Sequence, residues 1–338
     1  MTDKRILIIY TGGTIGMTRT PDGYAPEKGY LKSELDMISD MHDSGMPAWD
    51  LLEFEELLDS SNITYREWNQ IARAIDDNYD DYDGFVVLHG TDTMAYTASA
   101  LSFMLENLSK PVILTGSQIP LCELRSDGKD NIITSIIIAA EGVVNEVCLF
   151  FGTKLLRGNR STKNSADGLI AFASPNYPPL AEAGIDIDYH KSIIRPKPEG
   201  VFNVCYIDES SIGVIKLFPG IHFKLFEPIV TEKLQGLVLE TFGTGNIPNY
   251  DAELPGLIAK AIDNGTMVVV CTQCAHGTVQ LGAYETSSAL ARTGALSGYN
   301  MTTEATIAKL HYLFSKKCSA DKMRKMMNRS LCGEVDPE

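Results

Sequence analysis

Short apolar runs alternate with amphipathic stretches along the first half of the chain. The runs are rich in β-branched and aromatic residues and stop at glycine or polar clusters, which is typical of strands buried on both faces. These predicted strands span 4–10, 84–89, 111–115 and 147–151. The stretches between them predict helices at 64–79, 93–108 and 129–140. The first of these helices opens with the capping-box spacing of Thr64 and Glu67.

The alternation is interrupted once and then resumes. From about 185 to 211 the pattern has no sustained period and contains Pro196 and Pro198. Beyond it, strands are predicted at 213–218, 236–239 and 266–271, and helices at 253–264, 303–316 and 320–327. Because uninterrupted apolar strands alternate with helices, we expect a parallel sheet with helices on both faces.

The predicted fold class is therefore α/β with two domains. The larger N-terminal domain (1–187) is expected to be a doubly wound, mostly parallel sheet of the flavodoxin-like or Rossmann-like kind. A linker (188–210) then leads to a smaller C-terminal α/β domain (211–338).

Composition narrows the class of partner. The chain has 44 acidic and 29 basic residues, and the resulting net charge of −15 repels phosphate backbones and anionic lipid headgroups. The longest apolar stretch, 132–140, is far shorter than the roughly 20 residues of a membrane span, and the run 6–10 is too short for a signal peptide. Seven irregularly spaced cysteines are typical of reduced thiols. These features predict a cytoplasmic protein without nucleic-acid or membrane partners.

Three of the predicted strands end in loops of similar chemistry. The loops have the sequences TGGTIG at 11–16, HGTDT at 89–93 and TGSQ at 115–118. Ligands of open parallel sheets bind beyond the carboxyl ends of the strands, so these loops are expected to converge on one place. A threonine oxygen is a nucleophile, and glycines let main-chain N–H groups approach a developing oxyanion. The set therefore suits nucleophilic attack on a carbonyl carbon.

Other interpretations of these loops have less support. The first loop lacks the G-x-G-x-x-G spacing of a dinucleotide site and the lysine of a Walker loop. Thr91 or Asp92 would also suit the N-terminal cap of the helix that starts near Thr93, a role compatible with chemistry. His89 lacks a G-x-S-x-G serine partner and is predicted to be a hydrogen-bonded scaffold residue.

The cysteine pair Cys271 and Cys274 forms a C-x-x-C motif that is compatible with a redox centre or half of a zinc site. No second pair and no H-E-x-x-H motif accompanies it, so two reduced thiols are the default. No metal site and no cofactor is predicted.

Together, TGGTIG and HGTDTM at 89–94 resemble the two signatures of the bacterial-type L-asparaginases, and the resemblance extends over essentially the whole chain. The pair in this order is far more specific than either motif alone. The chain start just before TGGTIG is similar to the cytoplasmic class. The resemblance implies hydrolysis of L-asparagine to L-aspartate and ammonia through a threonyl acyl-enzyme, in a homodimer or homotetramer.

The resemblance also implies roles for individual residues. Thr14 is similar to the nucleophile, and Tyr24, on a mobile loop after the first strand, to the tyrosine that closes over the substrate. The second triad of the family matches Thr91, Asp92 and Lys163. The residues implied to bind substrate are Asp59, Ser60 and Ser61 around the amino-acid head group, Ser117 and Gln118 in the same pocket, and Asn246 from a neighbouring subunit.

The general base stays open at this point. Lys163 acting through Thr91 has an ordinary pKa near 10.4, and Tyr24 one near 10, so neither is an obvious base at neutral pH. Main-chain N–H groups of the Thr91 loop are the expected oxyanion hole. Asp59 and Asp92 offer negative charge for the substrate's ammonium, while serine hydroxyls suit its carboxylate.

The sequence differs from the family pattern at one position, and three alternative functions remain. Some cytoplasmic members bind regulatory asparagine through an arginine, and Glu240 stands at that position here, which predicts weak or absent allostery of this kind. A glutaminase-asparaginase and an amidotransferase-type amidase subunit are the nearest alternative functions, because one methylene in a pocket is worth only about 1–3 kcal/mol. A non-catalytic redox or ligand-binding module is the alternative from another class.

Overall fold

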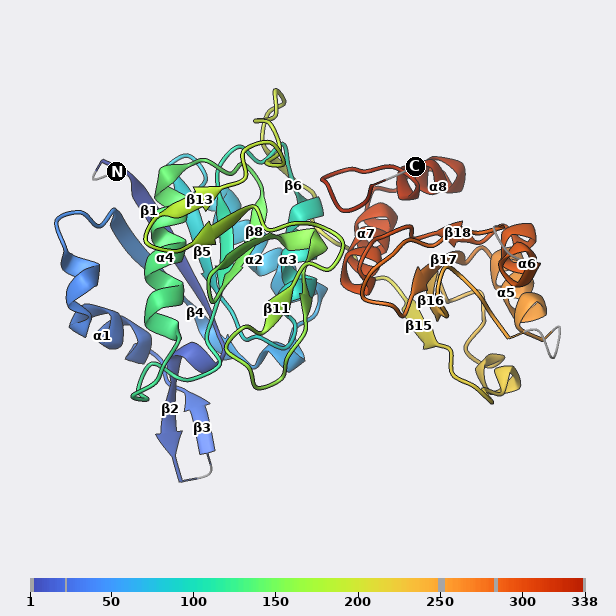
Figure 1. Cartoon of the computed structure of the whole chain (residues 1–338), viewed down its shortest axis with the longest axis horizontal. Coiled ribbons are helices and arrows are strands. Elements are labelled where there is room, and N and C mark those ends of the chain that lie inside the picture. Colours follow the sequence, from blue (N-terminus) through green and yellow to red (C-terminus); the bar gives the residue numbers. More distant parts are fainter. Residues whose placement is uncertain (1–2, 22, 249–252, 283–284, 337–338) are drawn as a thin grey trace. The chain divides into compact units, whose positions relative to one another are not determined.

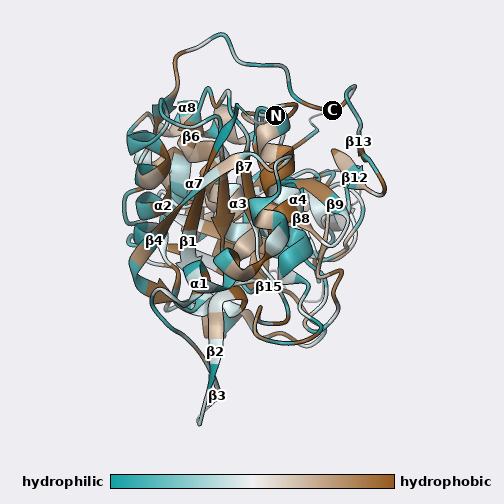
Figure 2. Cartoon of the chain, turned by 90° about the vertical axis from the view of Figure 1, so that its left-hand side faces the viewer, coloured by the Kyte–Doolittle hydropathy of each residue, from teal (hydrophilic) through white to brown (hydrophobic). Residues whose placement is uncertain are grey.

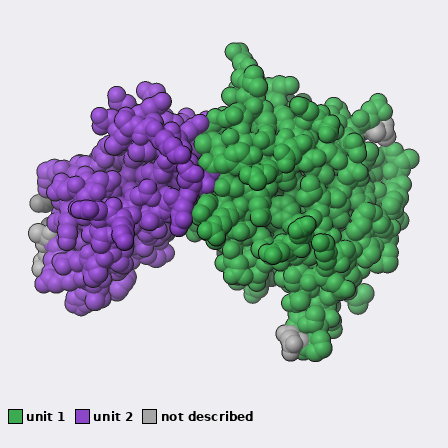
Figure 3. Space-filling view, turned by 180° about the vertical axis from the view of Figure 1, so that it is seen from behind, with its two compact units in different colours: residues 1–206 green, residues 207–338 purple. Residues whose placement is uncertain are grey.

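The structure, a computed structural model, describes residues 3–21, 23–248, 253–282 and 285–336 and divides into two compact units (Figure 1). The larger unit is Met1–Tyr206 and the smaller is Ile207–Glu338 (Figure 3). Each unit has its own strands, helices and apolar core. The predicted fold class, a two-domain α/β protein with a large, mostly parallel sheet, is confirmed.

The larger unit is built on an eight-stranded sheet of order β13-β12-β9-β8-β7-β5-β1-β4. Five neighbouring strands are parallel: β8 (Val147–Phe151), β7 (Val112–Thr115), β5 (Gly84–Leu88), β1 (Arg5–Gly12) and β4 (Ala48–Leu58). The remaining three add on antiparallel: β9 (Lys154–Arg157), β12 (Ala181–Ala183) and β13 (Ile187–Tyr189). Every residue of β5, β7 and β8 is buried, as their unbroken apolar sequences predict.

Helices cover both faces of this sheet. On β1, Ile6 and Ile8 belong to one apolar cluster with Ile132 and Ile136 of α4 (Gly128–Glu141), and α1 (Tyr30–Met37) joins the same cluster. Figure 2 shows apolar colouring along the strands of this unit. Contacts of α2 (Tyr65–Asp77) with β1 and of α3 (Met94–Met104) with β7 and β8 complete the packing. The predicted capping box is present at Thr64, whose main-chain N–H donates to the Glu67 carboxylate at 2.7 Å.

Several strands were not predicted from the hydrophobic pattern. They are β4, the hairpin of β2 (Met17–Thr20) and β3 (Gly23–Pro26), the pair β10 (Thr162–Lys163) and β11 (Phe172–Ala173), and the antiparallel end of the sheet. The helix predicted to 108 ends at Met104, because β6 (Leu105–Glu106) pairs with β14 (Asn203–Val204). The sequence of β4, WDLLEFEELL after Ala48, is rich in leucine and glutamate, which are good helix formers.

The smaller unit contains a parallel sheet of order β15-β16-β17-β18. Its strands are β15 (Ile212–Lys216), β16 (Gly236–Thr241), β17 (Met267–Thr272) and β18 (Leu296–Ser297), and its helices are α5 (Glu253–Asp263), α6 (Glu285–Thr293), α7 (Thr303–Ser315) and α8 (Ala320–Met327). The short strand β18 and helix α6 were not predicted. No helix in the described parts of the chain is long and apolar enough to cross a membrane.

Candidate active site

Main-chain contacts between glycines join the loops at the carboxyl edge of the large sheet. A Cβ on Gly13, after β1, would lie 2.4 Å from the main-chain nitrogen of Gly90, after β5. A Cβ on Gly90 would lie 2.5 Å from Oγ of Ser60, after β4, and one on Gly116, after β7, would lie 2.4 Å from the His89 carbonyl oxygen. Such distances leave no room for a side chain. The predicted convergence of the loops is therefore confirmed, and it includes a fourth loop, that of β4.

Thr14 stands at the start of the short helix η1 (Thr14–Gly16), directly after β1. The chain reaches it through Gly12 and Gly13, whose φ angles of 125° and 87° favour glycine. The Gly13 N–H donates to the Leu58 carbonyl at 3.1 Å, which ties this turn to the edge strand β4. Thr14 is partly exposed, and its hydroxyl makes no hydrogen bond with a described residue. It is thus an accessible oxygen in a rigid turn.

Lys163 brings the second predicted group together. Its Nζ lies 2.9 Å from Thr91 Oγ1 and 2.7 Å from Asp92 Oδ1. The Lys163 side chain is 19% exposed and that of Asp92 is 64% exposed. Neither Thr91 nor Asp92 is the N-cap residue of α3, because Thr93 occupies that position. The hydroxyl of Thr93 donates instead to the Ser60 carbonyl at 2.7 Å.

The predicted head-group segment lies between β4 and the helix η3 (Ser60–Asn62). The Asp59 carboxylate accepts the Ser61 main-chain N–H at 2.9 Å, so a hydrogen bond within the segment stabilises its turn. Ser60 is buried against Gly90, whereas Asp59 and Ser61 are exposed. The segment therefore adjoins the Thr91 loop through Ser60.

Tyr24 lies on β3, in the hairpin that projects from the larger unit (Figure 1). Its hydroxyl donates to Glu123 at 2.8 Å, and Arg19 Nε binds the same carboxylate at 2.6 Å. The hydrogen bond to Glu123 raises the pKa of Tyr24, while Arg19 and Tyr24 lower the pKa of Glu123. The structure thus pairs the Tyr24 hydroxyl with Glu123, and no hydrogen bond joins it to Thr14 in the described part of the chain.

His89 is the scaffold residue that the sequence predicted. It is 1% exposed, and burial lowers its pKa to about 4, so the ring is neutral. Nδ1 donates to the Gly90 carbonyl at 2.6 Å, which leaves Nε2 to accept from the Thr97 hydroxyl at 2.9 Å. Trp68 Nε1 donates to the same hydroxyl at 3.1 Å. These bonds fix the main chain just before Thr91.

Ser117 and Gln118 follow β7 and are held by two residues that sequence reasoning missed. The Asp127 carboxylate accepts the Gln118 and Ile119 main-chain N–H groups at 3.1 and 3.0 Å. Asn131 Nδ2 donates to the Gly116 carbonyl at 2.9 Å. Their only sequence signal is an Asp and an Asn four positions apart at the start of a helix. Oγ of Ser117 is buried and has no hydrogen-bond partner among the residues that the structure describes.

The remaining predicted residues belong to the smaller unit. The Phe242 N–H donates to the Asn246 carbonyl in the turn after β16. Glu240 accepts the Thr303 hydroxyl at 2.6 Å and faces Lys216 at 3.6 Å. The described residues include no cluster of His, Cys, Asp and Glu arranged for a metal ion.

The C-x-x-C motif holds two free thiols. Cys271 is buried, and its burial raises its pKa to about 12, while Cys274 is exposed. A thiol with so high a pKa is a poor nucleophile, so the redox interpretation loses support.

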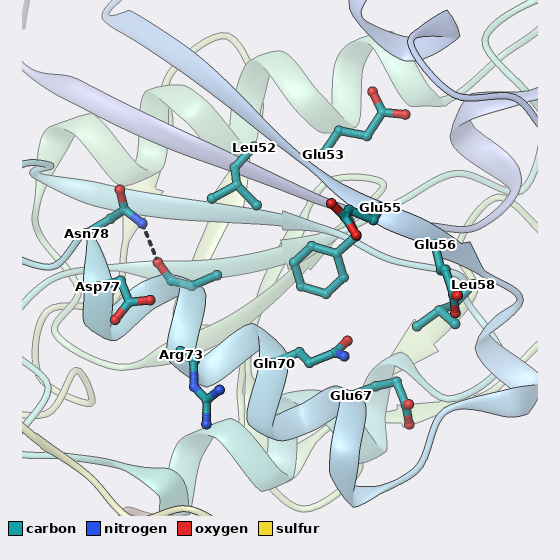
Figure 4. A pocket seen from close by; sticks show the side chains of 12 residues that line it. Leu52, Glu53, Glu55, Glu56, Leu58, Glu67, Gln70, Arg73, Asp77 and Asn78 are labelled. Atoms are coloured by element: carbon teal, nitrogen blue, oxygen red, sulfur yellow. Dashed lines mark hydrogen bonds between the residues drawn. The ribbon is translucent and has the colours of Figure 1, made fainter.

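A separate cavity of about 590 Å³ lies between β4 and α2 (Figure 4). Its walls include Glu55, Glu56 and Asp77, and none of the predicted catalytic residues lines it. It adjoins the candidate site only through Leu58, one residue before Asp59.

Comparisons with known proteins cover the whole chain. Residues 5–195 match the family model described as asparaginase, N-terminal, and residues 211–327 match the glutaminase/asparaginase C-terminal domain. L-asparaginase 1 of Escherichia coli is 49% identical over 338 residues, 100% of both chains. The crystal structure of L-asparaginase I from Vibrio cholerae is 47% identical, covers 99% of each chain and has a TM-score of 0.92. The human 60 kDa lysophospholipase is 40% identical over 99% of this chain and 62% of that protein.

Proposed function

We propose roles for the residues of this site from one premise: the chain belongs to the asparaginase family and is an amidohydrolase with L-asparaginase activity. Relatives with other names share the fold, so the roles are argued from the site and not from the fold. The observation that carries them is the main-chain contact of Gly13 with Gly90, which sets the Thr14 turn against the Thr91 loop.

Thr14 is proposed as the nucleophile. Its Oγ1 attacks the side-chain amide carbon of asparagine, ammonia leaves, and water then releases aspartate from the threonyl ester. The Thr14 hydroxyl has no hydrogen-bond partner to displace among the described residues, which supports this role. The main-chain N–H groups near Thr91 are proposed as the oxyanion hole, because His89 and its partners hold that turn rigid.

The Thr91, Asp92 and Lys163 group is proposed to act on the reacting atoms from the side opposite the Thr14 turn. Asp92 is exposed enough for its carboxylate to meet a substrate ammonium while Lys163 binds its other side. Asp59 and Ser61 are exposed on the adjoining turn and are proposed to bind the amino-acid head group. Tyr24 would have to leave Glu123 to reach the substrate, so its closing role requires a movement of the hairpin.

An oligomeric state and a cellular location are also proposed. We infer a homodimer or homotetramer in which Asn246 of one subunit completes the site of another, and a cytoplasmic location. The full-length similarity to L-asparaginase 1 of Escherichia coli and the seven free thiols support these inferences. Glu240 is occupied by Thr303 and Lys216, which supports the absence of an effector site built on this position.

Steady-state turnover by Thr14→Ala and Thr14→Ser tests the nucleophile. Loss of the hydroxyl is expected to reduce kcat by about three orders of magnitude or more, while Thr14→Ser keeps measurable activity and an aspartyl adduct visible by mass spectrometry. Thr18→Ala, in the neighbouring hairpin, is the control. Ammonia release is measured from asparagine and glutamine at equal concentration, which also separates the glutaminase alternative. If Thr14→Ala retains most of the activity, Thr14 is not the nucleophile.

A further inference from the structure

The side-chain amide of Gln118 is fully engaged by three partners. Nε2 lies 3.2 Å from the Ala166 carbonyl and 3.2 Å from the Gly168 carbonyl, in the loop that follows Lys163. Oε1 lies 3.1 Å from Thr91 Oγ1. Carbonyl oxygens accept and never donate, so the end of the amide beside them must be the NH₂ group. The oxygen of Gln118 therefore has to face Thr91.

This orientation determines where the proton of the Thr91 hydroxyl points. A hydroxyl has a single proton, and an amide oxygen accepts but cannot donate, so Thr91 donates to Gln118. Toward Lys163, at 2.9 Å, Thr91 then offers only a lone pair. An ammonium has three donors and no acceptor, and Nζ of Lys163 directs two of them at Thr91 and at Asp92, 2.7 Å away.

We propose that Gln118 is a positioning residue that fixes the direction of the Thr91 proton, so that Lys163 acts on Thr91 as a hydrogen-bond donor and not as its base. The inference rests on the proposed function, in which Thr91 works beside Thr14. It replaces the substrate-binding role predicted for Gln118, because both hydrogens of its amide are already donated to carbonyls.

The arrangement leaves one acceptor position on the Thr91 oxygen. One of its lone pairs accepts from Lys163 and its proton goes to Gln118, so the second lone pair is open. An open acceptor of this kind suits a water molecule that approaches the acyl carbon with a proton directed at Thr91. Thr91 thus orients the water and keeps its own proton. As the water oxygen bonds to the acyl carbon, the ester bond to Thr14 breaks, and a proton of the water passes to the departing Thr14 oxygen.

The surroundings of Gln118 are built to hold this geometry. The Asp127 carboxylate accepts the Gln118 main-chain N–H at 3.1 Å, and Asn131 ties down the preceding carbonyl of Gly116. Main chain and side chain are therefore both fixed, and the amide cannot rotate without breaking two bonds to carbonyls.

The smaller unit provides a matched control. Gln273, after β17, also donates its Nε2 to two main-chain carbonyls, those of Leu217 at 2.6 Å and Glu240 at 2.7 Å. Gln118→Met and Gln273→Met each keep the side-chain length and remove a similar pair of loop contacts. Only Gln118→Met also removes the acceptor of the Thr91 proton. Their kcat, KM and Tm values are compared, and Gln118→Met is repeated in a Thr91→Val background.

Gln118→Met is expected to lower kcat about tenfold, the effect of one lost hydrogen bond of roughly 1.4 kcal/mol, with KM within about twofold of wild type. The loss should vanish in the Thr91→Val background, because the hydroxyl on which Gln118 acts is then absent. Gln273→Met should lower Tm and leave kcat unchanged.

Three results would overturn the proposal: an unchanged kcat in Gln118→Met, a rise in KM alone, or an equal loss of kcat with and without the Thr91 hydroxyl. Failure of the proposed function itself has a different signature, namely no asparagine turnover by wild type or full turnover by Thr14→Ala in the same series.

Discussion

Both units contain a set of neighbouring parallel strands, but they differ in the groups at the carboxyl ends of these strands. In the smaller unit several polar groups at this edge bind one another: Thr241 donates to the Cys271 carbonyl at 2.9 Å, Gln273 to two carbonyls, and Thr303 to Glu240. The Thr244 hydroxyl, in the turn after β16, is buried without a partner among the described residues. In the larger unit the buried Ser117 hydroxyl also lacks a partner among the described residues, but Thr14 is partly exposed and Asp92 is 64% exposed. Because a buried hydroxyl without a partner occurs at both edges, accessible reactive groups, namely Thr14 and Asp92, distinguish the edge of the larger unit.

The lysines of the two units show the same contrast. Lys163 is partly exposed beside an exposed aspartate, whereas Lys309 and Glu334 form an ion pair in which both side chains are 0% exposed. Lys309 also donates to the Met327 and Arg329 carbonyls at 3.0 and 2.6 Å, which fastens the C-terminal segment to α7. Its donors are all used for structure.

Replacing each lysine by methionine gives the strongest test of the contrast between a structural Lys309 and a functional Lys163. Lys309→Met should reduce the free energy of unfolding by about 3–5 kcal/mol, because Glu334 is left as an unpaired buried charge, while kcat of the folded protein stays near wild type. Lys163→Met should change stability by no more than about 1 kcal/mol, since its pair is partly exposed, but should lose most turnover. Chemical denaturation and ammonia release measure the two quantities. A Lys309→Met protein of wild-type stability would contradict the structural role.

The features that consecutive residues encode could be predicted from the sequence. The runs TGGTIG and HGTDTM carry their hydroxyls and turn glycines in a few consecutive positions, so the convergence of these loops could be predicted without a structure. Lys163 lies 72 positions from Thr91 and was reached only through the family resemblance, and the roles of all these residues stay predictions. Buried strands such as β5 and β7 were predictable for the same reason, because each is a continuous apolar run.

Cross-links between distant loops were not predictable. Asp127 binds Gln118 across nine positions, and Gln118 binds Thr91 across 27 and Gly168 across 50. Nothing in the spacing of these residues specifies the pairing, which arises only when parallel strands bring their carboxyl ends together. The edge strand β4 was missed because its leucines and glutamates favour a helix, and only pairing with β1 makes it a strand.

Each unit also buries one neutral histidine, which leads to a prediction about pH. Burial lowers the pKa of His89 and of His311 to about 4. In the unfolded chain a histidine binds its proton near pH 6.5, so between pH 6.5 and 4 the unfolded state binds more protons and stability falls as the pH falls. Each histidine should cost roughly 3 kcal/mol at pH 4 relative to pH 7.

Replacing each histidine by glutamine should have the same effect on stability but a different effect on turnover. His89→Gln and His311→Gln should both flatten the acid limb of the stability curve, measured by denaturation at a series of pH values. Only His89→Gln should also reduce turnover, because His89 orients the Gly90 carbonyl beside Thr91. Equal effects of both variants on kcat would remove this difference between the units.

Ser117 gives the smallest and most specific test of unused capacity. Its buried hydroxyl makes no hydrogen bond with any described residue, so Ser117→Ala should change the free energy of unfolding by less than about 1 kcal/mol. Ser99, on α3, has an equally buried hydroxyl without a partner, and Ser99→Ala is the matched control. If the Ser117 hydroxyl binds a polar group of the substrate, Ser117→Ala alone should raise KM for asparagine, by up to about tenfold for one hydrogen bond. Equal KM values in the two variants would mean that an unsatisfied hydroxyl at this edge is a tolerated defect and not a substrate contact.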